Sequence, residues 1–363
     1  MNYMVDQEDG GGMGFNVGST WKPINMVAWM QKGHSINESL VTSTVYDTSK
    51  FNCNGYGFVG PWRVQNSGGG TTSPESLQGL IKSHNTTQAS MASNIGLCAI
   101  ADAAKEMGYH NAISNASDIY SANSFQPPMT IGTVQASPLT MANVYATMGA
   151  NGVECTPIAI TKVTDRSGSK VKVPSANCHQ AIDPDIAQTV SYALNQGVVQ
   201  PGGEASTTQL DNNRKTFAKT GTNENTVMTT AGFVPNQVAA FVAVADAQDP
   251  INNTFDNKTI NGVYRPFWYG MYIATPAWKQ FMNTYLAAIN APIDNDYGKG
   301  ADKYTVSKGA TRTYNQYQYQ RQQNSQQQSQ QQSQQQSQQQ TNQGQQQQSQ
   351  QQPAEQQSDQ QHQ

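Results

Sequence analysis

The stretch that decides the fold runs Gly18-Ser19-Thr20-Trp21-Lys22-Pro23. Apolar residues follow it at helical spacing and proline suits a first helical turn, so we predict a helix that begins at Ser19 and ends at Gly33. Side chains three positions apart share a helix face, which lets the Ser19 hydroxyl meet the Lys22 amine. The amine can remove the hydroxyl proton only if burial or nearby positive charge lowers its pKa. Alone this pattern is a weak signal, because an ordinary helix cap with a solvated lysine has the same sequence.

Two further motifs follow along the chain. Ser83-His84-Asn85 lies within a predicted helical block from Ser76 to about Gly108, and Lys219-Thr220-Gly221-Thr222 lies on a predicted strand. Gly221 would let a substrate backbone approach the edge of this strand. The lysine and the hydroxyls around it can hold a carboxylate. In isolation Ser83-His84-Asn85 is also a weak signal, because a Ser-x-Asn triplet is usually a turn or a cap.

The pattern along the chain places helices before strands. Ser137-Pro138 and Asp183-Pro184 each combine an N-cap with proline at the first helical position, and Gly197 is placed to end the second of these helices. Between Tyr46 and Thr72 we expect a loop or a short hairpin. Three strand-like runs and one helical piece come later: KTFAKTGT, MTTAGFVP, VAAFVAVADA and TPAWKQFMNTYLAAI. The expected fold class is α/β of the α+β kind, with helices packed on an antiparallel sheet.

Composition divides the chain into a foldable part and a tail. From about residue 311 the chain is dominated by Gln, so we expect residues 1–300 to form one domain and residues 311–363 to be a disordered tail. The net charge of −3, with 12% charged residues, offers no basic stripe for nucleic acid and no Lys/Arg run for an anionic lipid surface. We therefore expect no nucleic-acid partner. No stretch is long and apolar enough to span a bilayer, so no membrane segment is expected.

The four cysteines are Cys53, Cys98, Cys155 and Cys178, and none has C-x-x-C or Cys/His spacing, so no metal site is expected. Several disulfide connectivities are possible. We favour Cys53 with Cys98 and Cys155 with Cys178, because each pair closes a short, sequence-local loop. Each closure would contribute on the order of 3 kcal/mol by chain entropy, and disulfides presume an oxidising, extracytoplasmic compartment. Four buried free thiols in a cytosolic protein are the alternative.

The ordered set S-x-x-K, S-x-N and K-T-G resembles the motifs of penicillin-binding proteins and class A β-lactamases. Four longer segments resemble the transpeptidase domain of class A penicillin-binding proteins: GSTWKPINMVAWMQKGHSINES, LIKSHNTTQASMASNIGLCAIADAAKEMG, TIGTVQASPLTMANVYATMGANGVECTPIAITKVTDRSG and TFAKTGTNEN. The resemblance covers roughly residues 14 to 290. It is closest to the actinobacterial kind, in which a similar cysteine pair flanks the segment that here runs from Cys155 to Cys178. It implies a penicillin-binding/β-lactamase-like fold.

The resemblance also implies roles for the residues around the serine. Ser19 would be acylated and Lys22 would be its general base. Ser83 would relay a proton to the leaving group, oriented by Lys22 and Lys219. Asn85 would form a hydrogen bond with the amide of the acyl donor.

On the strand, the resemblance assigns substrate binding. Lys219, Thr220 and Thr222 would hold the terminal carboxylate of a D-alanyl-D-alanine donor or of a β-lactam. The backbone N–H groups of Ser19 and Thr222 would form the oxyanion hole. No metal or organic cofactor is implied.

The implied activity is that of a serine D,D-transpeptidase that cross-links peptidoglycan stem peptides to an amine acceptor at the cell-wall face of the plasma membrane, in cell-wall and cell-shape biosynthesis. Two alternatives are a D,D-carboxypeptidase or β-lactamase-like hydrolase, and a truncated, non-catalytic wall-binding domain. We find no family-like Glu motif between Ser83 and Lys219 to activate a deacylating water, which disfavours the β-lactamase.

The sequence departs from the family in two places. The family domain begins with two strands ahead of the serine, whereas a polar leader precedes Ser19 here, so we expect an N-terminally truncated domain without its anchor. After the K-T-G strand, Thr229 and Thr230 stand where the family has large apolar residues. Packing beneath the active-site strand is therefore expected to differ.

Overall fold

A three-stranded antiparallel sheet lies in the middle of the computed structural model, which describes residues 1–69, 74–121, 124–249 and 252–307. Its strand order is β11-β10-β9. The strands are β9 (Phe217–Asn223), β10 (Val227–Val234) and β11 (Val238–Val244). Short turns join them as consecutive hairpins, with Ala231 opposite both Lys219 and Phe241. The three strand-like runs of the sequence are thus the strands of this sheet, and the K-T-G motif lies on its β9 edge.

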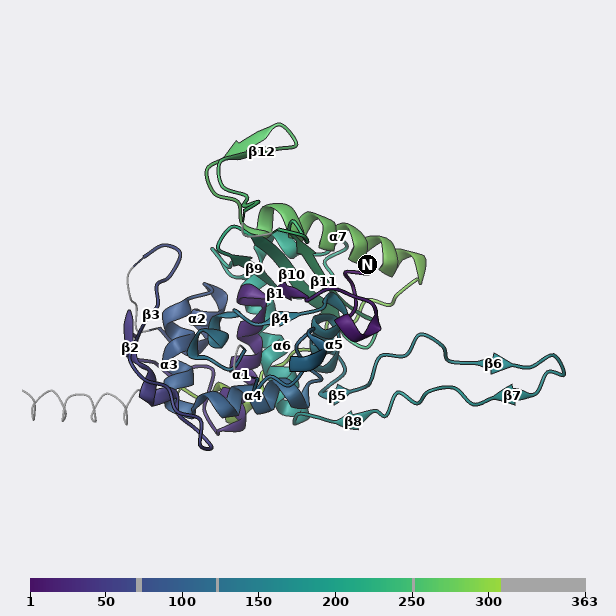
Figure 1. Cartoon of the computed structure of the whole chain (residues 1–363), viewed down its shortest axis with the longest axis horizontal. Coiled ribbons are helices and arrows are strands. Elements are labelled where there is room, and N and C mark those ends of the chain that lie inside the picture. Colours follow the sequence, from purple (N-terminus) through teal and green to yellow (C-terminus); the bar gives the residue numbers. More distant parts are fainter. Residues whose placement is uncertain (70–73, 122–123, 250–251, 308–363) are drawn as a thin grey trace, which may run out of the picture. The chain divides into compact units, whose positions relative to one another are not determined.

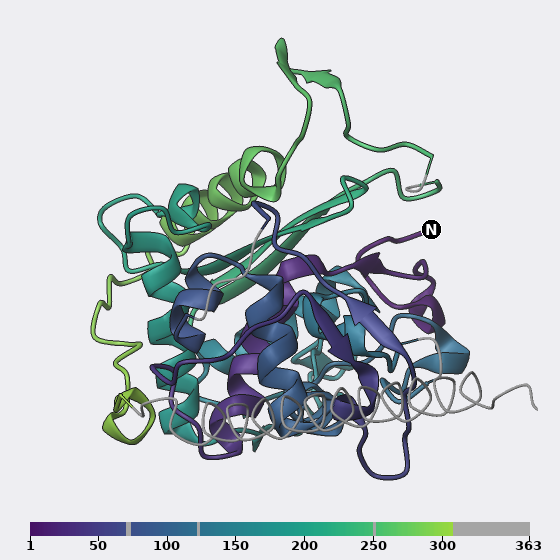
Figure 2. The same cartoon turned by 90° about the vertical axis from the view of Figure 1, so that its left-hand side faces the viewer.

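Helices cover both faces of the sheet, and the predicted class of helices packed on an antiparallel sheet is confirmed (Figures 1 and 2). Helix α7 (Gly270–Ala288) packs on one face, while α5 (Pro138–Gly149) and α6 (Pro184–Val199) pack on the other. Trp278 of α7 is fully buried and donates its indole N–H to the carbonyl oxygen of Ala240 at 3.0 Å. Burial of such large apolar side chains against the strands stabilises the layers.

Helix α1 (Lys22–Gln31) is the helix predicted after Ser19, and nine of its ten residues are buried. It contacts α3, α4 and α6, so helices surround it on several sides. A short 3-10 helix, η2 (Gly18–Trp21), precedes it and carries Ser19. Gly33 follows its end with a φ of 83°, a left-handed conformation in which glycine pays no steric penalty.

Two helix caps are confirmed and two helical boundaries are corrected. The side chains of Ser137 and Asp183 accept hydrogen bonds from the first turns of α5 and α6. The expected stop at Gly197 is wrong, because α6 continues to Val199. The block from Ser76 to Gly108 is three helices rather than one: α2 (Ser76–Ile81), α3 (Asn85–Ile95) and α4 (Leu97–Glu106). Positive φ values at Ser83 and Gly96 break it, since a right-handed helix cannot continue through them.

The two threonines that replace large apolar residues are fully buried in β10, and both are satisfied by hydrogen bonds. The Thr229 hydroxyl donates to the carbonyl oxygen of Val17 at 3.0 Å. The Thr230 hydroxyl lies 2.9 Å from that of Thr275 in α7. Polar contacts to the serine-bearing segment and to α7 thus replace apolar packing at these positions, at little cost because the hydroxyls are paired.

The remaining elements are short. Two-residue strands form the pairs β1–β4, β5–β8 and β6–β7, and three-residue strands form β2–β3 and β12–β13. Their bounds are β1 (Phe15–Asn16), β2 (Val45–Asp47), β3 (Pro61–Arg63), β4 (Gln135–Ala136), β5 (Val153–Glu154), β6 (Val163–Thr164), β7 (Lys170–Val171), β8 (His179–Gln180), β12 (Lys258–Ile260) and β13 (Val263–Arg265). The helical turns are η1 (Gln7–Asp9), η3 (Thr48–Phe51), η4 (Ser114–Ala116), η5 (Pro127–Ile131), η6 (Ser206–Thr208) and α8 (Asp302–Thr305).

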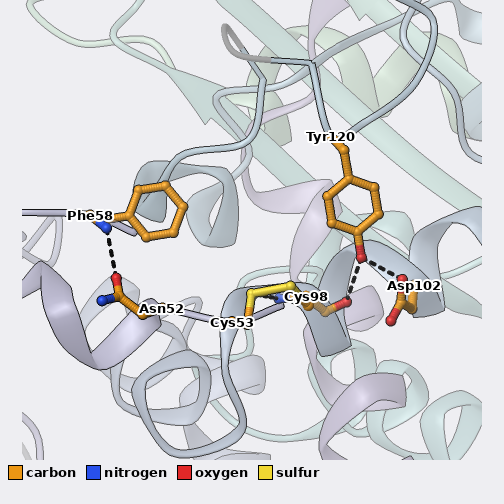
Figure 3. Close-up of a disulfide and its surroundings, with 6 residues drawn as sticks. All are labelled: Asn52, Cys53, Phe58, Cys98, Asp102 and Tyr120. Atoms are coloured by element: carbon orange, nitrogen blue, oxygen red, sulfur yellow. Dashed lines mark hydrogen bonds between the residues drawn. A yellow bond between two sulfur atoms is a disulfide. The ribbon is translucent and has the colours of Figure 1, made fainter. Parts of the chain in front are cut away.

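Two disulfides confirm the favoured pairing of the cysteines: Cys53 with Cys98, and Cys155 with Cys178. The first ties the loop between β2 and β3 to the first turn of α4 (Figure 3). Beside it, Tyr120 donates a hydrogen bond to the Asp102 carboxylate and lies 3.4 Å from the carbonyl oxygen of Cys98. The loop or short hairpin expected from Tyr46 onward is therefore the β2–β3 hairpin, which this disulfide holds against α4.

Residues 308–363 lie outside the described residues, and with them the expected tail at 311–363. Within the described ranges, no helix has the length and apolar character needed to cross a membrane.

Candidate active site

The backbone around Ser19 is fixed by close contacts with two neighbouring segments. Gly18 donates its N–H to the carbonyl oxygen of Gly132 at 2.9 Å, and a Cβ on Gly132 would lie 1.8 Å from the carbonyl oxygen of Gly18. The Tyr145 hydroxyl of α5 donates to the carbonyl oxygen of Thr20 at 2.8 Å. Ser19 itself is half-buried, and no hydrogen bond joins its hydroxyl to the part of the chain that the structure describes. A firmly held turn thus presents an accessible hydroxyl.

Lys22 enters a pocket of oxygen atoms one turn after the serine. Its Nζ donates to the carbonyl oxygen of Ser83 at 2.6 Å and to Oδ1 of Asn85 at 2.6 Å. A third contact, to the hydroxyl of Ser83, is 3.2 Å long. The side chain is fully buried. The first two acceptors cannot donate, so a neutral amine would direct both of its hydrogens to them.

Two buried amines face each other across this pocket. Burial lowers the pKa of Lys22 well below its usual value, and the positive charge of Lys219 lowers this pKa further. Burial also lowers the pKa of Lys219, to about 8. The carboxylate of Glu204 opposes both shifts because it favours the protonated amines. The electrostatics therefore favour one neutral amine, Lys22, beside one that is protonated near neutral pH.

Ser83 connects the two amines from a strained position. It lies in the turn between α2 and α3 with a φ of 55°, a conformation that costs a non-glycine residue about 1 kcal/mol or more. Its hydroxyl accepts a hydrogen bond from Lys219 Nζ at 2.9 Å. Backbone strain of this kind persists where the surrounding structure enforces it, and it is concentrated at functional sites.

Asn85 is held from the side opposite Lys22. Its amide nitrogen donates to the carbonyl oxygen of Gln65 at 2.8 Å. The next residues on both segments are also joined, because Thr86 N–H donates to the Asn66 side chain at 3.1 Å. Tyr46 adds a hydrogen bond from its hydroxyl to the carbonyl oxygen of Thr86. The hairpin that Cys53 tethers to α4 thus positions the start of α3.

The K-T-G strand lies directly against the serine turn. A Cβ on Gly221 would lie 2.2 Å from the Thr229 hydroxyl and 3.2 Å from the Ser19 nitrogen, so only glycine fits there. The Thr222 hydroxyl accepts the N–H of Gly270 at 3.0 Å. Close packing of η2 on β9 brings the N–H of Ser19 beside the backbone at Gly221 and Thr222.

The structure gathers Lys22, Ser83, Asn85 and Lys219 into one hydrogen-bonded cluster. Ser19 precedes Lys22 by one turn, and among the described residues its hydroxyl forms no hydrogen bond with this cluster. Thr220 adjoins the cluster, because its carbonyl oxygen accepts a hydrogen bond from Lys219 Nζ at 2.9 Å, while its hydroxyl donates to the carbonyl oxygen of Glu204 at 3.1 Å. The order of the motifs therefore predicts a grouping that the fold produces, although the roles assigned to these residues stay predictions.

Sequence reasoning missed the residues that support the cluster from loops. Glu204 lies between Ser83 and Lys219 in the sequence, but it belongs to no motif and is exposed. Gln65 holds the Asn85 side chain through its backbone carbonyl oxygen, and Asn66 holds the backbone N–H of Thr86 through its side-chain amide. Backbone partners and long-range charges leave no local pattern, so no signal in the sequence could have singled these residues out.

A serine at the start of a buried helix, two buried amines that share one hydroxyl, and a glycine-containing strand beside them define a serine acyltransferase. Such a site can deprotonate a hydroxyl, stabilise an oxyanion and bind a carboxylate without a bound metal.

Comparison with known proteins gives the family. The family model of the penicillin binding protein transpeptidase domain matches residues 14–256, so the chain belongs to this family. Penicillin-binding protein 1A of Neisseria meningitidis is 28% identical in an alignment of 276 residues that covers 73% of this chain and 30% of that protein. Penicillin-binding protein 1A of Mycolicibacterium smegmatis is 25% identical in an alignment of 286 residues that covers 74% of this chain and 33% of that protein. The chain spans about a third of the length of these relatives.

A solved structure shows the same fold. The PonA1 protein from Mycobacterium tuberculosis, in complex with penicillin V, superimposes with a TM-score of 0.61 at 20% identity and covers 81% of this chain and 75% of that one. These matches confirm the resemblance to class A penicillin-binding proteins and include mycobacterial relatives, although the Neisseria proteins are slightly more identical.

Proposed function

We propose that this chain is a D,D-transpeptidase that cross-links peptidoglycan stem peptides through an acyl-enzyme on Ser19, and that β-lactams acylate the same serine. The observation that carries the proposal is the continuous contact from Lys22 through the Ser83 hydroxyl to Lys219, beside an accessible serine hydroxyl. Family membership supports the general chemistry. The two disulfides support an extracytoplasmic place of work, at the cell-wall face of the plasma membrane.

In the first step Lys22 acts as the base. As a neutral amine it directs its hydrogens to the Ser83 carbonyl and Asn85. Its lone pair is then left to accept a proton, and in this step it would turn from the 3.2 Å contact with the Ser83 hydroxyl to take the Ser19 proton. The serine oxygen then attacks the carbonyl carbon of the penultimate D-alanine. Negative charge develops on the carbonyl oxygen, which the N–H groups of Ser19 and Thr222 would stabilise.

Collapse of this intermediate breaks the peptide bond to the terminal D-alanine. The leaving nitrogen needs a proton, and the Ser83 hydroxyl can deliver one because Lys22 and Lys219 both contact it. Lys219, with the hydroxyls of Thr220 and Thr222, would hold the terminal carboxylate of the donor. An acceptor amine then attacks the acyl-enzyme, gives up its proton along the reverse path and restores the Ser19 hydroxyl.

Mass spectrometry of a donor peptide that ends in D-Ala-D-Ala, incubated with the protein and an excess of a D-amino acid, tests the proposal. The expected product is the donor with its terminal D-alanine replaced by the added amine. Ser19→Ala should abolish it, whereas Ser114→Ala, at an exposed serine, should not. Hydrolysed donor alone would identify a D,D-carboxypeptidase instead. If the folded protein converts no donor peptide at all, the remaining alternative is a non-catalytic wall-binding domain.

A further inference from the structure

Residues 155–178 form a ribbon, called the arm below, that extends away from the helices and the sheet (Figure 1). The disulfide between Cys155 and Cys178 closes its base, and β5 pairs with β8 just before it. Strands β6 and β7 pair in its outer part. Every residue from Thr161 to Lys172 is exposed. The arm therefore contributes no core packing, and its side chains are available to a partner.

The register of the arm sorts its side chains onto two faces. Val163 lies opposite Val171, and Thr164 lies opposite Lys170. Directly opposed residues share a face and successive residues alternate. Lys162 and Lys172 flank these strands, and the same register continued by one residue would set them opposite each other on the face of Lys170. One face of the ribbon thus carries three lysines, and the other carries the two valines.

This cationic face has no internal counter-charge. Arg166 adds a fourth cation in the turn, and Asp165 is the only acidic residue of the arm. The Asp165 carboxylate accepts hydrogen bonds from the hydroxyl and N–H of Ser167 and from the N–H of Ser169, at 2.6, 2.8 and 2.9 Å. Among the described residues none of the four cations forms an ion pair. Like charges on opposed residues repel each other and destabilise a ribbon, so binding of an anionic partner would reduce this repulsion.

The geometry favours a linear partner. On this face Lys170 and Lys172 follow each other along one strand about 7 Å apart, and Lys162 lies about 5 Å from Lys172 on the other strand, so the three charges are spread along the ribbon. Amphipathic insertion into a bilayer places apolar and cationic side chains at the same surface, whereas Val163 and Val171 lie on the opposite face. Purely electrostatic binding to anionic lipid uses clusters of about four to eight Lys/Arg, more than the three lysines of this face. Single-stranded nucleic acids are bound largely by stacking on aromatic side chains, and the arm has none.

We propose that the cationic face of the arm, with Lys162, Lys170 and Lys172, binds a linear polymer that carries phosphate groups. Compact ammonium groups suit phosphate as point charges. The arm would hold such a polymer away from the serine site, so this inference does not rest on the acyl-transfer chemistry.

The test is binding of long-chain inorganic polyphosphate to the full chain at several salt concentrations. The variant is Lys162→Gln/Lys170→Gln/Lys172→Gln, and its matched control is Lys32→Gln/Lys50→Gln/Lys258→Gln, which removes equal charge from exposed lysines elsewhere. The arm variant should bind at least about tenfold more weakly at low salt, and its slope of log affinity against log salt should be shallower by about 2. The control variant should retain more of the affinity and the original slope.

Equal weakening by both variants would overturn the proposal, because general charge would then explain the binding. So would tighter arm-dependent binding to phosphatidylglycerol vesicles or to a single-stranded oligonucleotide than to polyphosphate. Poly-glutamate that binds as well as polyphosphate would contradict the choice of phosphate. A thermal unfolding midpoint equal to that of the wild type shows that each variant is folded.

Discussion

The Nζ atom of Lys219 lies 2.9 Å from the hydroxyl oxygen of Ser83, which is 136 residues earlier in the chain. The Nζ atom of Lys22 lies 3.2 Å from the same oxygen. One hydroxyl thus joins two buried amines that cannot both be charged without repulsion. The protonation state of this pair should therefore govern the rate at which Ser19 is acylated.

The pH dependence of acylation follows from these two amines. The reaction needs Lys22 neutral, and burial lowers its pKa, so the rate should rise with pH below the usual range of a lysine. It also needs Lys219 protonated, so the rate should fall above about pH 8. The second-order rate constant for a fluorescent penicillin, measured from about pH 5 to about pH 10, should give a bell-shaped profile. A rate that keeps rising to the top of this range would contradict the assignment of both lysines.

Glu204→Gln should move this profile to lower pH. The Glu204 carboxylate raises the pKa of both lysines, so its removal lets both amines lose their protons at lower pH. Both limbs should shift in the same direction by a few tenths of a pH unit, about the size expected for an exposed charge. The same measurement on Glu8→Gln, which changes an exposed glutamate that shifts neither lysine, should show no movement. A shift of the profile to lower pH in both variants, or in neither, would contradict a specific effect of Glu204 on the two lysines.

The backbone strain at Ser83 gives a prediction that separates stability from activity. Ser83→Gly and Ser83→Ala both remove the hydroxyl, and each should slow acylation roughly 100-fold. Only glycine relieves the φ of 55°, so Ser83→Gly should be more stable than Ser83→Ala by about 1 kcal/mol in chemical denaturation. At Ser93, inside α3, the order should reverse, because alanine favours a helix over glycine by about 1 kcal/mol. Equal stability of the two Ser83 variants would show that the position is unstrained.

The two disulfides should differ in their effect on the site. Cys53→Ser/Cys98→Ser opens a closure of 45 residues, worth about 4 kcal/mol by chain entropy. It should also slow acylation, because the hairpin that supports Asn85 through Gln65 loses its tether. Cys155→Ser/Cys178→Ser opens only the base of the arm, so acylation should stay unchanged. Denaturation and penicillin labelling of both double variants measure the contrast, and equal labelling rates would exclude positioning through the hairpin.

Sequence predicted the parts of the fold that local patterns encode. The β-branched and Ala/Val-rich runs of β9 to β11 and the caps at Ser137 and Asp183 depend on residues that are close in the chain, and all were found. The order of three motifs also predicted which side chains would meet. The sequence alone was therefore enough to predict a serine acyltransferase site.

Sequence could not predict features that arise from distant contacts. The positive φ of Ser83 is imposed by the turn between α2 and α3, and nothing in the triplet reveals it. The cationic face of the arm was missed because its lysines alternate with other residues, and only the strand register aligns them. Glu204 acts on the amines through space from a loop without a motif.

Intact-mass measurement after incubation with benzylpenicillin, followed by peptide mapping, tests the central claim most directly. Opening of the β-lactam ring expels no fragment, so the protein should gain the mass of one whole penicillin molecule on the peptide that contains Ser19. The adduct should be absent from Ser19→Ala and present in Ser114→Ala. A folded wild-type protein that gains no mass, or an adduct that persists in Ser19→Ala, would contradict the assignment of Ser19 as the nucleophile.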